Sequence, residues 1–378
     1  MKLKCLYASS SDCSDAFYIS GVRVPDPYLS LIAGRHKIAI VNQLEYSRVK
    51  KESKYTKVYE VESLKAKIID HYYLTKGAFN LGHFVKYFFD LYKANTILIP
   101  KSFPAFLLLE LQNLEIPIVL SESSFLPERE QKSIEEIESI KVGNKASAYG
   151  LGIAQSALKA SKVKKGILYL DGAVLSSERL RAMIELSLFE KGSIASSTIV
   201  AGGIQASDPH QIGYGPLKAN ELIIVDIFPQ IKNSGYYGDM TRTFLKGKAN
   251  EAQKKLVHSV KTAQKLAISK IKANVTGSTI HSEVTSYFNQ KGYLTERQSN
   301  GDTFVGFIHS TGHGLGLDIH EDPKVSTSKN KLKANHVITV EPGLYYPDIG
   351  SCRIEDVFAV TKKGSRKLSR FNYQWQIS

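Results

Sequence analysis

The sequence predicts an α+β protein of two domains, a small α/β domain followed by a larger domain in which helices cover an antiparallel sheet. The length of 378 residues is more than one average domain needs. Short apolar runs alternate with helical patterns at the beginning of the chain, and a polar segment at 121–132 follows them. Long amphipathic helices and separate strand patterns fill the rest. We therefore place the domains at residues 1–125 and 128–378.

In the first domain, strand and helix patterns follow one another closely. Apolar runs at 38–41, 96–99 and 116–120 are typical of short buried strands. The aromatic and aliphatic residues of 84–92 share one helical face, and 106–114 is a second apolar helix pattern. This alternation favours a compact α/β domain.

The second domain is expected to begin with a long helix. Glu136 lies three residues after Ser133, which is the spacing of a capping box, and the helix should continue to about residue 161. We expect further helices beginning near Ser177 and Glu178, over 251–272, and over 279–291 with Gly292 at the C-cap. Apolar runs at 222–225 and 337–340 are typical of strands.

Composition restricts the classes of function. The net charge of +14 could indicate nucleic-acid binding, but only 11 of 50 basic residues are Arg and the Lys are scattered, which favours a solvated surface without specific nucleic-acid binding. Three cysteines cannot form a disulfide framework and indicate a reducing compartment. We find no signal peptide and no apolar stretch of about 18 residues, so we expect a cytoplasmic protein without a membrane span.

Five potential metal ligands follow one another through the last 153 residues. They are Asp226 in LIIVDIFPQ, Asp239 in GYYGDMTRTF, His313 in HSTGHGLGLDIHEDP, Glu341 in ITVEPGLYY and Glu355 in GSCRIEDVF. Four carboxylates and one imidazole are too few for two closed metal cages, but suffice for a pair of divalent ions that share bridging carboxylates. Such a pair lowers the pKa of a water between them from about 15.7 toward about 7, which makes hydroxide available for hydrolysis. Hard oxygen donors favour manganese, and the imidazole also suits cobalt, iron or zinc.

The order Asp, Asp, His, Glu, Glu, together with GDMTRTF, GHGLGLDIHE, VEPGLYY and RIED, resembles the pita-bread metallopeptidases of family M24, which include methionine aminopeptidase, prolidase and aminopeptidase P. The resemblance covers about 250 residues, from near Glu128 to the C-terminus. The preceding segment resembles the creatinase-like N-terminal domain of the proline-specific branch. The resemblance therefore implies a pita-bread catalytic domain after a smaller α/β creatinase-like domain.

The sequence departs from the family pattern at one place. Asp226 and Asp239 are thirteen positions apart, whereas family members usually separate these ligands by eleven. Asn233, Ser234 and Gly235 favour a turn, so two additional residues fit in a hairpin loop without moving either strand end. Asp226 therefore remains a candidate ligand.

The resemblance assigns a role to each ligand: Asp226 chelates one ion, His313 and Glu341 the other, and Asp239 and Glu355 bridge them. Any one of these carboxylates taken alone would be read as a strand-end or turn residue. The resemblance also implies that Glu341 carries a proton to the departing nitrogen. The complete set in the expected order favours the metal site.

Four further residues are candidates for substrate binding or catalysis. His320 would hydrogen-bond to the substrate carbonyl, the alternative being a surface histidine. The resemblance implies that His210 borders the substrate, and His309 could donate in the same pocket. Arg353 is two positions before Glu355, so we expect both on the same face of one strand. There Arg353 could orient that carboxylate or bind a substrate carboxylate, the alternative being a structural ion pair.

The resemblance implies an enzyme that uses two divalent ions to cleave the bond before proline in a peptide substrate. We favour an Xaa-Pro aminopeptidase, because the loop lengthened by Asn233, Ser234 and Gly235 could flank an extended substrate; an Xaa-Pro dipeptidase (prolidase) is the alternative. Methionine aminopeptidases generally lack a first domain of this size. A non-catalytic binding module and a metal-free creatinase-type hydrolase would lack this ligand set. Quaternary structure is open, a homodimer being one arrangement.

Overall fold

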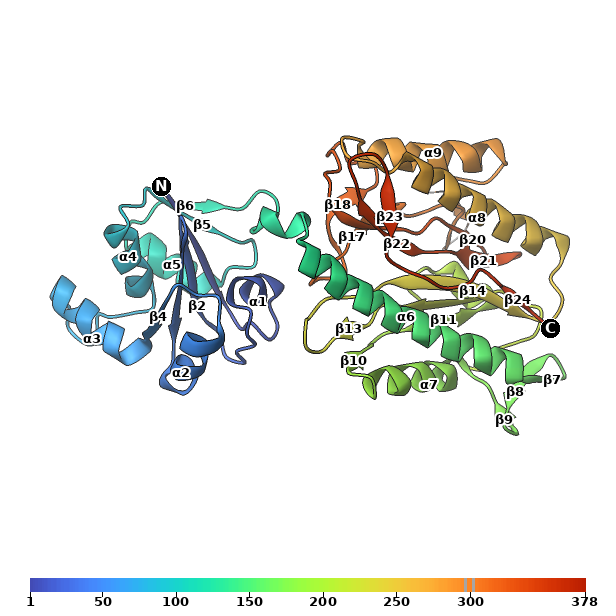
Figure 1. The fold of residues 1–378 in the computed structure, drawn as a ribbon, viewed down its shortest axis with the longest axis horizontal. Helices are drawn as coiled ribbons and strands as arrows, with labels where there is room; N and C mark the ends of the chain where they lie inside the picture. The colour runs from blue at the N-terminus through green and yellow to red at the C-terminus, as the bar shows by residue number, and fades with distance from the viewer. Residues whose placement is uncertain (296–297, 301–302) are drawn as a thin grey trace. The chain divides into compact units, whose positions relative to one another are not determined.

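The computed structural model describes residues 1–295, 298–300 and 303–378. By contacts it divides into two compact units, Met1–Arg129 and Glu130–Ser378, and each is considered by itself (Figure 1). No helix among the described residues is long and apolar enough to cross a membrane.

The first unit has a central, mainly parallel sheet with strand order β4-β3-β2-β1-β5-β6, in which only β2 runs antiparallel to its neighbours. Its strands are β1 (Lys2–Ala8), β2 (Tyr28–Ala33), β3 (His36–Val41), β4 (Lys57–Glu60), β5 (Thr96–Ile99) and β6 (Ile118–Leu120). Its helices are α1 (Ser14–Ser20), α2 (Gln43–Glu52), α3 (Val61–Tyr72), α4 (Gly82–Leu91), α5 (Ala105–Asn113) and the 3₁₀ helix η1 (Pro127–Glu130). The expected strands and helices of this region are confirmed.

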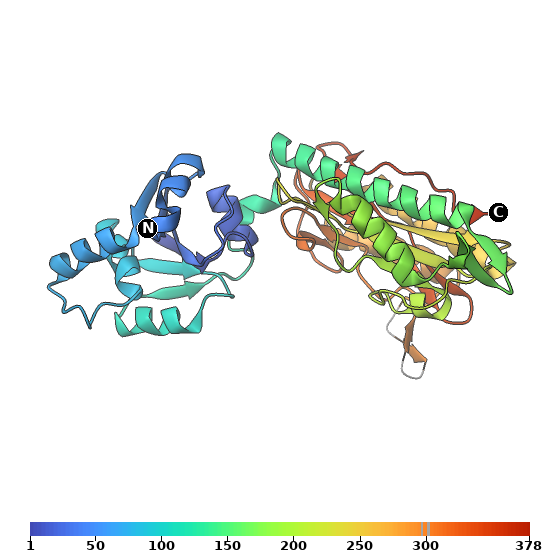
Figure 2. The ribbon, with the colours of Figure 1, turned by 90° about the horizontal axis from the view of Figure 1, so that it is seen from below.

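Side-chain alternation explains why helices cover both faces of this sheet. Ile38 and Ile40 of β3 pack in the core formed with α3, α4 and α5, whereas Ala39 and Val41 pack with Val49 of α2. Successive strand residues point to opposite faces, so one apolar run serves two cores. Figure 2 shows the sheet with helices on either side of it.

The second unit begins with α6 (Ile134–Ala160), whose capping box joins Ser133 and Glu136 as the sequence predicts. Three further helices match expected patterns: α7 (Ser177–Phe189), α8 (Glu251–Lys270) and α9 (Gly277–Gln290). A short 3₁₀ helix, η2 (Gly203–Ser207), precedes the loop that carries His210. Helices α6 and α7 pack in one core and α8 and α9 in another, and Figure 1 shows them on opposite sides of the strands.

Two sheets form the centre of this unit, with strand orders β11-β12-β14-β24 and β18-β17-β19-β22-β23. Their strands are β11 (Ile199–Gly202), β12 (Ile223–Ile227), β14 (Met240–Lys246), β24 (Gln376–Ile377), β17 (Gly312–Gly314), β18 (Glu321–Val325), β19 (Val337–Val340), β22 (Asp356–Val360) and β23 (Ser365–Lys367). Smaller pairings involve β7 (Lys162–Lys164), β8 (Ile167–Leu170), β9 (Ala173–Val174), β10 (Ser193–Ile194), β13 (Gln230–Ile231), β15 (Gln298–Asn300), β16 (Thr303–Val305), β20 (Gly343–Tyr346) and β21 (Gly350–Arg353). Helices covering mainly antiparallel sheets confirm the expected α+β class.

The loop between the two Asp ligands behaves as the sequence predicts. Lys232, Asn233 and Ser234 form a turn after β13, and Gly235 has a positive φ of 76°. Strands β12 and β14 stay in register, with Asp226 opposite Thr241. The additional residues therefore lie in the turn and do not displace the strand ends.

Candidate metal centre

Strands of both sheets bring the five predicted ligands to one place. Asp226 lies on β12 and Asp239 directly before β14, so adjacent strands carry both. His313 is the central residue of β17, Glu341 follows β19, and Glu355 precedes β22. These three segments are neighbours in the second sheet. Two ligands thus lie on hydrogen-bonded strands and three directly at strand ends, where side-chain positions are fixed better than in long loops.

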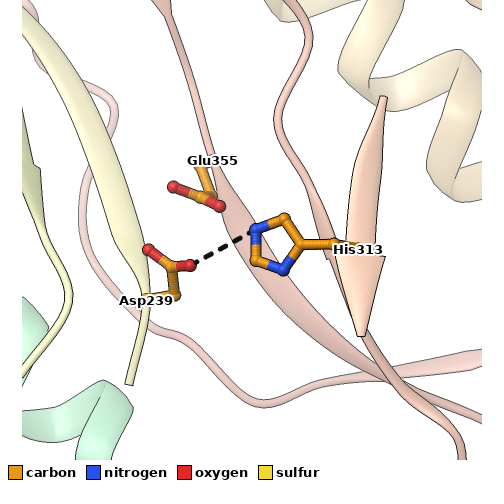
Figure 3. Close-up of side chains that lie close together, drawn as sticks. All are labelled: Asp239, His313 and Glu355. Carbon is orange, nitrogen blue, oxygen red and sulfur yellow. Dashed lines mark ion pairs between the residues drawn. The ribbon is translucent and has the colours of Figure 1, made fainter. Parts of the chain in front are cut away.

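Three of these side chains form a compact group. One ligand atom from each of Asp239, His313 and Glu355 lies within 4.8 Å of the others, and Figure 3 shows the three side chains converging. His313 Nε2 is 3.7 Å from Asp239 Oδ2 and 3.3 Å from Glu341 Oε1. Asp226 is near enough that its charge raises the pKa of Asp239, Glu341 and Glu355. Geometry and electrostatics therefore join all five residues.

Close backbone packing holds two of the ligand segments. A Cβ added to Gly143 of α6 would lie 2.4 Å from the backbone nitrogen of Gly238, so only glycine lets the helix reach the segment before Asp239. The next residue of α6, Asn144, accepts a hydrogen bond from the Asp239 amide at 3.4 Å. Beside His313, a Cβ on Gly312 would meet the backbone oxygen of Thr339 at 2.1 Å. Glycines of the GHGLG stretch thus pack against neighbouring strands.

Burial and mutual repulsion raise the pKa of three of the ligand carboxylates. Burial raises the pKa of Asp239 well above its ordinary value, and the charges of Asp226 and Glu341 raise it further. Burial and the neighbouring carboxylates likewise raise the pKa of Glu355, and burial raises that of Glu341 to about 7 although Arg353 opposes the shift. Like charges in a poorly solvated site disfavour ionisation of all four carboxylates together.

Two observations test whether divalent ions fit these residues. Ionised, four carboxylates would carry four negative charges against one nearby guanidinium, an imbalance that bound cations remove. Asp226 Oδ1 is buried and has no hydrogen-bond partner in the described part of the chain, although buried carboxylate oxygens normally have one. Burial lowers the pKa of His313, so the imidazole is neutral and has a lone pair for a metal. The donor set therefore fits divalent metal ions.

Arg353 is hydrogen-bonded to one ligand carboxylate and linked to a second through a threonine hydroxyl. Its side chain is 5% exposed, and its guanidinium donates to Asp226 Oδ2 at 2.7 Å and to the Tyr345 hydroxyl at 2.8 Å. Its Nε donates to Thr241 Oγ1 at 3.4 Å, and that hydroxyl donates to Glu355 Oε2 at 2.7 Å. The guanidinium thus reaches Asp226 directly and Glu355 through Thr241.

One detail of the sequence interpretation is wrong. Arg353 and Glu355 were expected on one face of a single strand, but β21 ends at Arg353 and β22 begins at Asp356. The chain leaves the β20–β21 hairpin there and enters the larger sheet. The two side chains are still linked, because the Thr241 hydroxyl on β14 is hydrogen-bonded to both.

Three orienting residues were missed from the sequence: Thr241, Thr339 and Tyr345. Thr339 Oγ1 donates to Glu341 Oε1 at 3.2 Å and accepts from the His313 amide at 3.1 Å. Thr241 and Thr339 each lie two positions from a ligand. In an extended segment this spacing places side chains on the same face, so it could have marked them.

The three histidines that the sequence analysis proposed for substrate binding lie around the group of ligands. The rings of His320 and His313 are perpendicular, with centroids 4.4 Å apart. His309 Nε2 is 2.8 Å from the Tyr345 hydroxyl, and burial lowers the pKa of His309 to about 3. His210 is exposed on the loop after η2, and its charge lowers the pKa of both His309 and His320. Arg353 and His320 therefore contact ligands, His309 is linked to Arg353 through Tyr345, and His210 is near enough to affect His309 and His320 electrostatically.

A second buried network lies next to Glu355. Arg242 donates to the Glu355 backbone oxygen at 2.7 Å and to Asp356 Oδ1 at 3.0 Å. Burial raises the pKa of Asp356, but the charges of Arg242 and Lys367 outweigh this and hold it below its ordinary value. This ion pair fixes the backbone that carries Glu355.

Known proteins share this fold and parts of this sequence. The sequence profile of metallopeptidase family M24 matches residues 146–362. An Xaa-Pro dipeptidase of Pyrococcus horikoshii is 35% identical over 178 residues, which are 47% of this chain and 47% of that protein. The chain thus aligns with about half the length of this relative.

Two solved structures resemble the whole chain. One is the prolidase from Pyrococcus horikoshii OT3, with a TM-score of 0.77, 26% identity, and coverage of 98% of this chain and 94% of that one. The other is the X-Pro aminopeptidase from Thermotoga maritima MSB8, with a TM-score of 0.78, 22% identity, and coverage of 100% and 98%. These similarities confirm the expected pita-bread catalytic domain with a preceding N-terminal domain.

Proposed function

The chain belongs to metallopeptidase family M24, and we propose that it is an Xaa-Pro aminopeptidase, which uses two divalent metal ions to release the residue before proline from the N-terminus of peptides. The observation that carries the hydrolase assignment is the buried group formed by Asp239, His313 and Glu355, with Glu341 beside it. A binding module has no need of three buried carboxylates and a fourth, largely buried one whose charges repel one another. Relatives with both dipeptidase and aminopeptidase names support the proline-specific chemistry.

In this proposal Asp226 would hold one ion, His313 and Glu341 would hold the other, and Asp239 and Glu355 would be shared between the two. Such ions supply a water of lowered pKa and polarise the scissile carbonyl. Because the donors are mainly carboxylates, we propose manganese in preference to cobalt, iron or zinc.

The remaining steps belong to the protein's own groups. His320 donates a hydrogen bond to the substrate carbonyl oxygen as negative charge develops there. The Glu341 carboxylate takes the proton released by the attacking water and delivers it to the proline nitrogen as the C–N bond breaks. His309, fixed by Tyr345, and the exposed His210 border the peptide.

The preference for longer peptides rests on Arg353. A strict dipeptidase needs a cation that grips the free proline carboxylate, and Arg353 is a candidate for that task. Its guanidinium is already bonded to Asp226, Tyr345 and, at 3.4 Å, the Pro209 backbone oxygen. This engagement favours an open pocket that accepts a continuing chain.

Two measurements test the proposal. Exhaustive chelation of the purified protein should abolish Xaa-Pro hydrolysis, and manganese or cobalt should restore it; undiminished activity in metal-free protein would exclude the dinuclear mechanism. In the restored enzyme, kcat/KM for an Xaa-Pro-Xaa tripeptide should equal or exceed that for the matching Xaa-Pro dipeptide. A dipeptide preference of about tenfold or more, equivalent to about 1.4 kcal/mol, would assign the enzyme as a prolidase.

A further inference from the structure

A buried ion pair closes the turn that carries His320. Lys132 and Glu321 are 189 positions apart in the chain, and Lys132 Nζ donates to Glu321 Oε2 at 2.6 Å. The side chains are only 2% and 8% exposed. Burying two charges sacrifices much of their hydration, so such a pair is a poor means of stabilising a fold. The contacts of the pair with the turn around His320 indicate its role better than its contribution to stability does.

The Glu321 carboxylate fills the inside of the turn. Its Oε1 accepts a hydrogen bond from the Asp318 amide at 3.0 Å. A Cβ added to Gly316 would meet the same carboxylate at 2.6 Å, so the turn is packed around it. His320 is the residue directly before Glu321. The carboxylate therefore lies inside the turn, directly next to the residue whose imidazole packs against His313.

Lys132 is a rigid anchor for this turn. Its backbone amide donates to Asn335 at 2.9 Å, and the preceding Gln131 forms a β-bridge with His336. The following Ser133 is the N-cap of α6. The backbone on both sides of Lys132 is thus fixed within the second unit, and its ammonium group is held at a defined place.

We propose that Lys132 and Glu321 are a positioning pair, which sets the place of His320 toward the substrate carbonyl and so governs the chemical step. This inference rests on the proposed function, because the role of His320 belongs to it. Without the ammonium group, the buried Glu321 carboxylate loses this ion pair, and we expect the turn around it to shift. A displacement of about 1 Å at a catalytic group can lower a rate by about 10²-fold.

The first test compares the Lys132→Met variant with the wild-type enzyme, both as full-length proteins. Metal content should stay at the wild-type level and KM should change by less than about threefold, while kcat falls by about 10- to 100-fold. Amide hydrogen exchange should accelerate in peptides that contain Asp318, whose amide bonds to Glu321. Glu321→Gln keeps the side-chain shape, removes the charge, and should behave alike. Lys270→Met removes the ion pair with Glu283, which is 2.9 Å long and more exposed, and should change none of these quantities.

A double mutant separates positioning from general destabilisation. If the pair acts through His320, Lys132→Met should lower kcat little further in a His320→Ala background. An equal fold loss in both backgrounds would overturn the proposal, as would unchanged exchange and unchanged kcat in both single variants. Hydrogen exchange does not depend on the substrate. A wild-type protein without Xaa-Pro activity would therefore refute the proposed function, while the exchange result would still report whether the pair holds the turn.

Discussion

Replacing Arg353 with Met tests whether this guanidinium orients the metal ligands. The side chain is buried, and it donates short hydrogen bonds to the Asp226 carboxylate and the Tyr345 hydroxyl. Breaking a buried charge pair by removing one partner costs about 3–5 kcal/mol, because the other charge stays buried without compensation. We expect a loss of this size in the free energy of unfolding of the metal-free second unit. Loss of an orienting partner should also weaken metal affinity by about 10- to 100-fold.

The chain provides a convenient reporter for this measurement. Its single Trp, Trp375, packs against the core of the second unit, so denaturant unfolding followed by tryptophan fluorescence reports on that unit. Arg370→Met is the matched control, because Arg370 is exposed and its loss should change stability by less than about 0.5 kcal/mol. If Arg353→Met unfolds within about 1 kcal/mol of the wild type and binds metal with unchanged affinity, the orienting role is wrong.

Three further outcomes are expected. Asp239→Ala or Glu355→Ala should lose both metal ions together, as measured by elemental analysis, and a variant that retains two ions would remove that residue from the bridge. His320→Ala should keep both ions while kcat falls by about 10²- to 10³-fold, and a collapse of metal content would instead make His320 a ligand. Burial and the charge of Lys333 lower the pKa of His336 to about 4. An unfolded His titrates near pH 6.5, so burying His336 in its neutral form costs nothing above about pH 6.5, but lowers the free energy of unfolding by about 3 kcal/mol as pH falls toward 4. His336→Gln should therefore weaken the pH dependence of the free energy of unfolding in denaturation measurements. An unchanged pH dependence would refute this expectation.

Local patterns in the sequence predicted much of this structure. The capping box at Ser133 and Glu136 marked the beginning of α6, and the apolar runs marked β5, β12 and β19, because capping and side-chain alternation depend on near neighbours. The ligand order predicted a group that the folded strands do bring together. The capping box, each apolar run and the stretch around each ligand are written within a few residues, although the five ligands together span residues 226–355.

The features that escaped prediction depend on residues distant in the chain. Thr241 contacts Glu355 across 114 positions, and Lys132 contacts Glu321 across 189. The sequence does not distinguish a buried lysine from a solvent-exposed one, and the carboxylate that pairs with a buried lysine is known only from the folded structure. The break between β21 and β22 escaped for a similar reason, since the chain changes sheets there without a glycine or proline between Arg353 and Asp356.

The protonation of the histidines explains how charge is distributed in this site. Burial lowers the pKa of His309, His313 and His320, so these imidazoles stay neutral at pH 7. Protonated imidazoles would neutralise the carboxylates from within the protein and would compete with metal ions for them. With neutral rings, Arg353 is the cationic side chain that bonds to a ligand carboxylate in the described part of the chain, and it is also bonded to Tyr345. In the proposed metal centre, metal ions would therefore supply the positive charge that the carboxylates need, while the three neutral imidazoles can serve as ligands or hydrogen-bond donors.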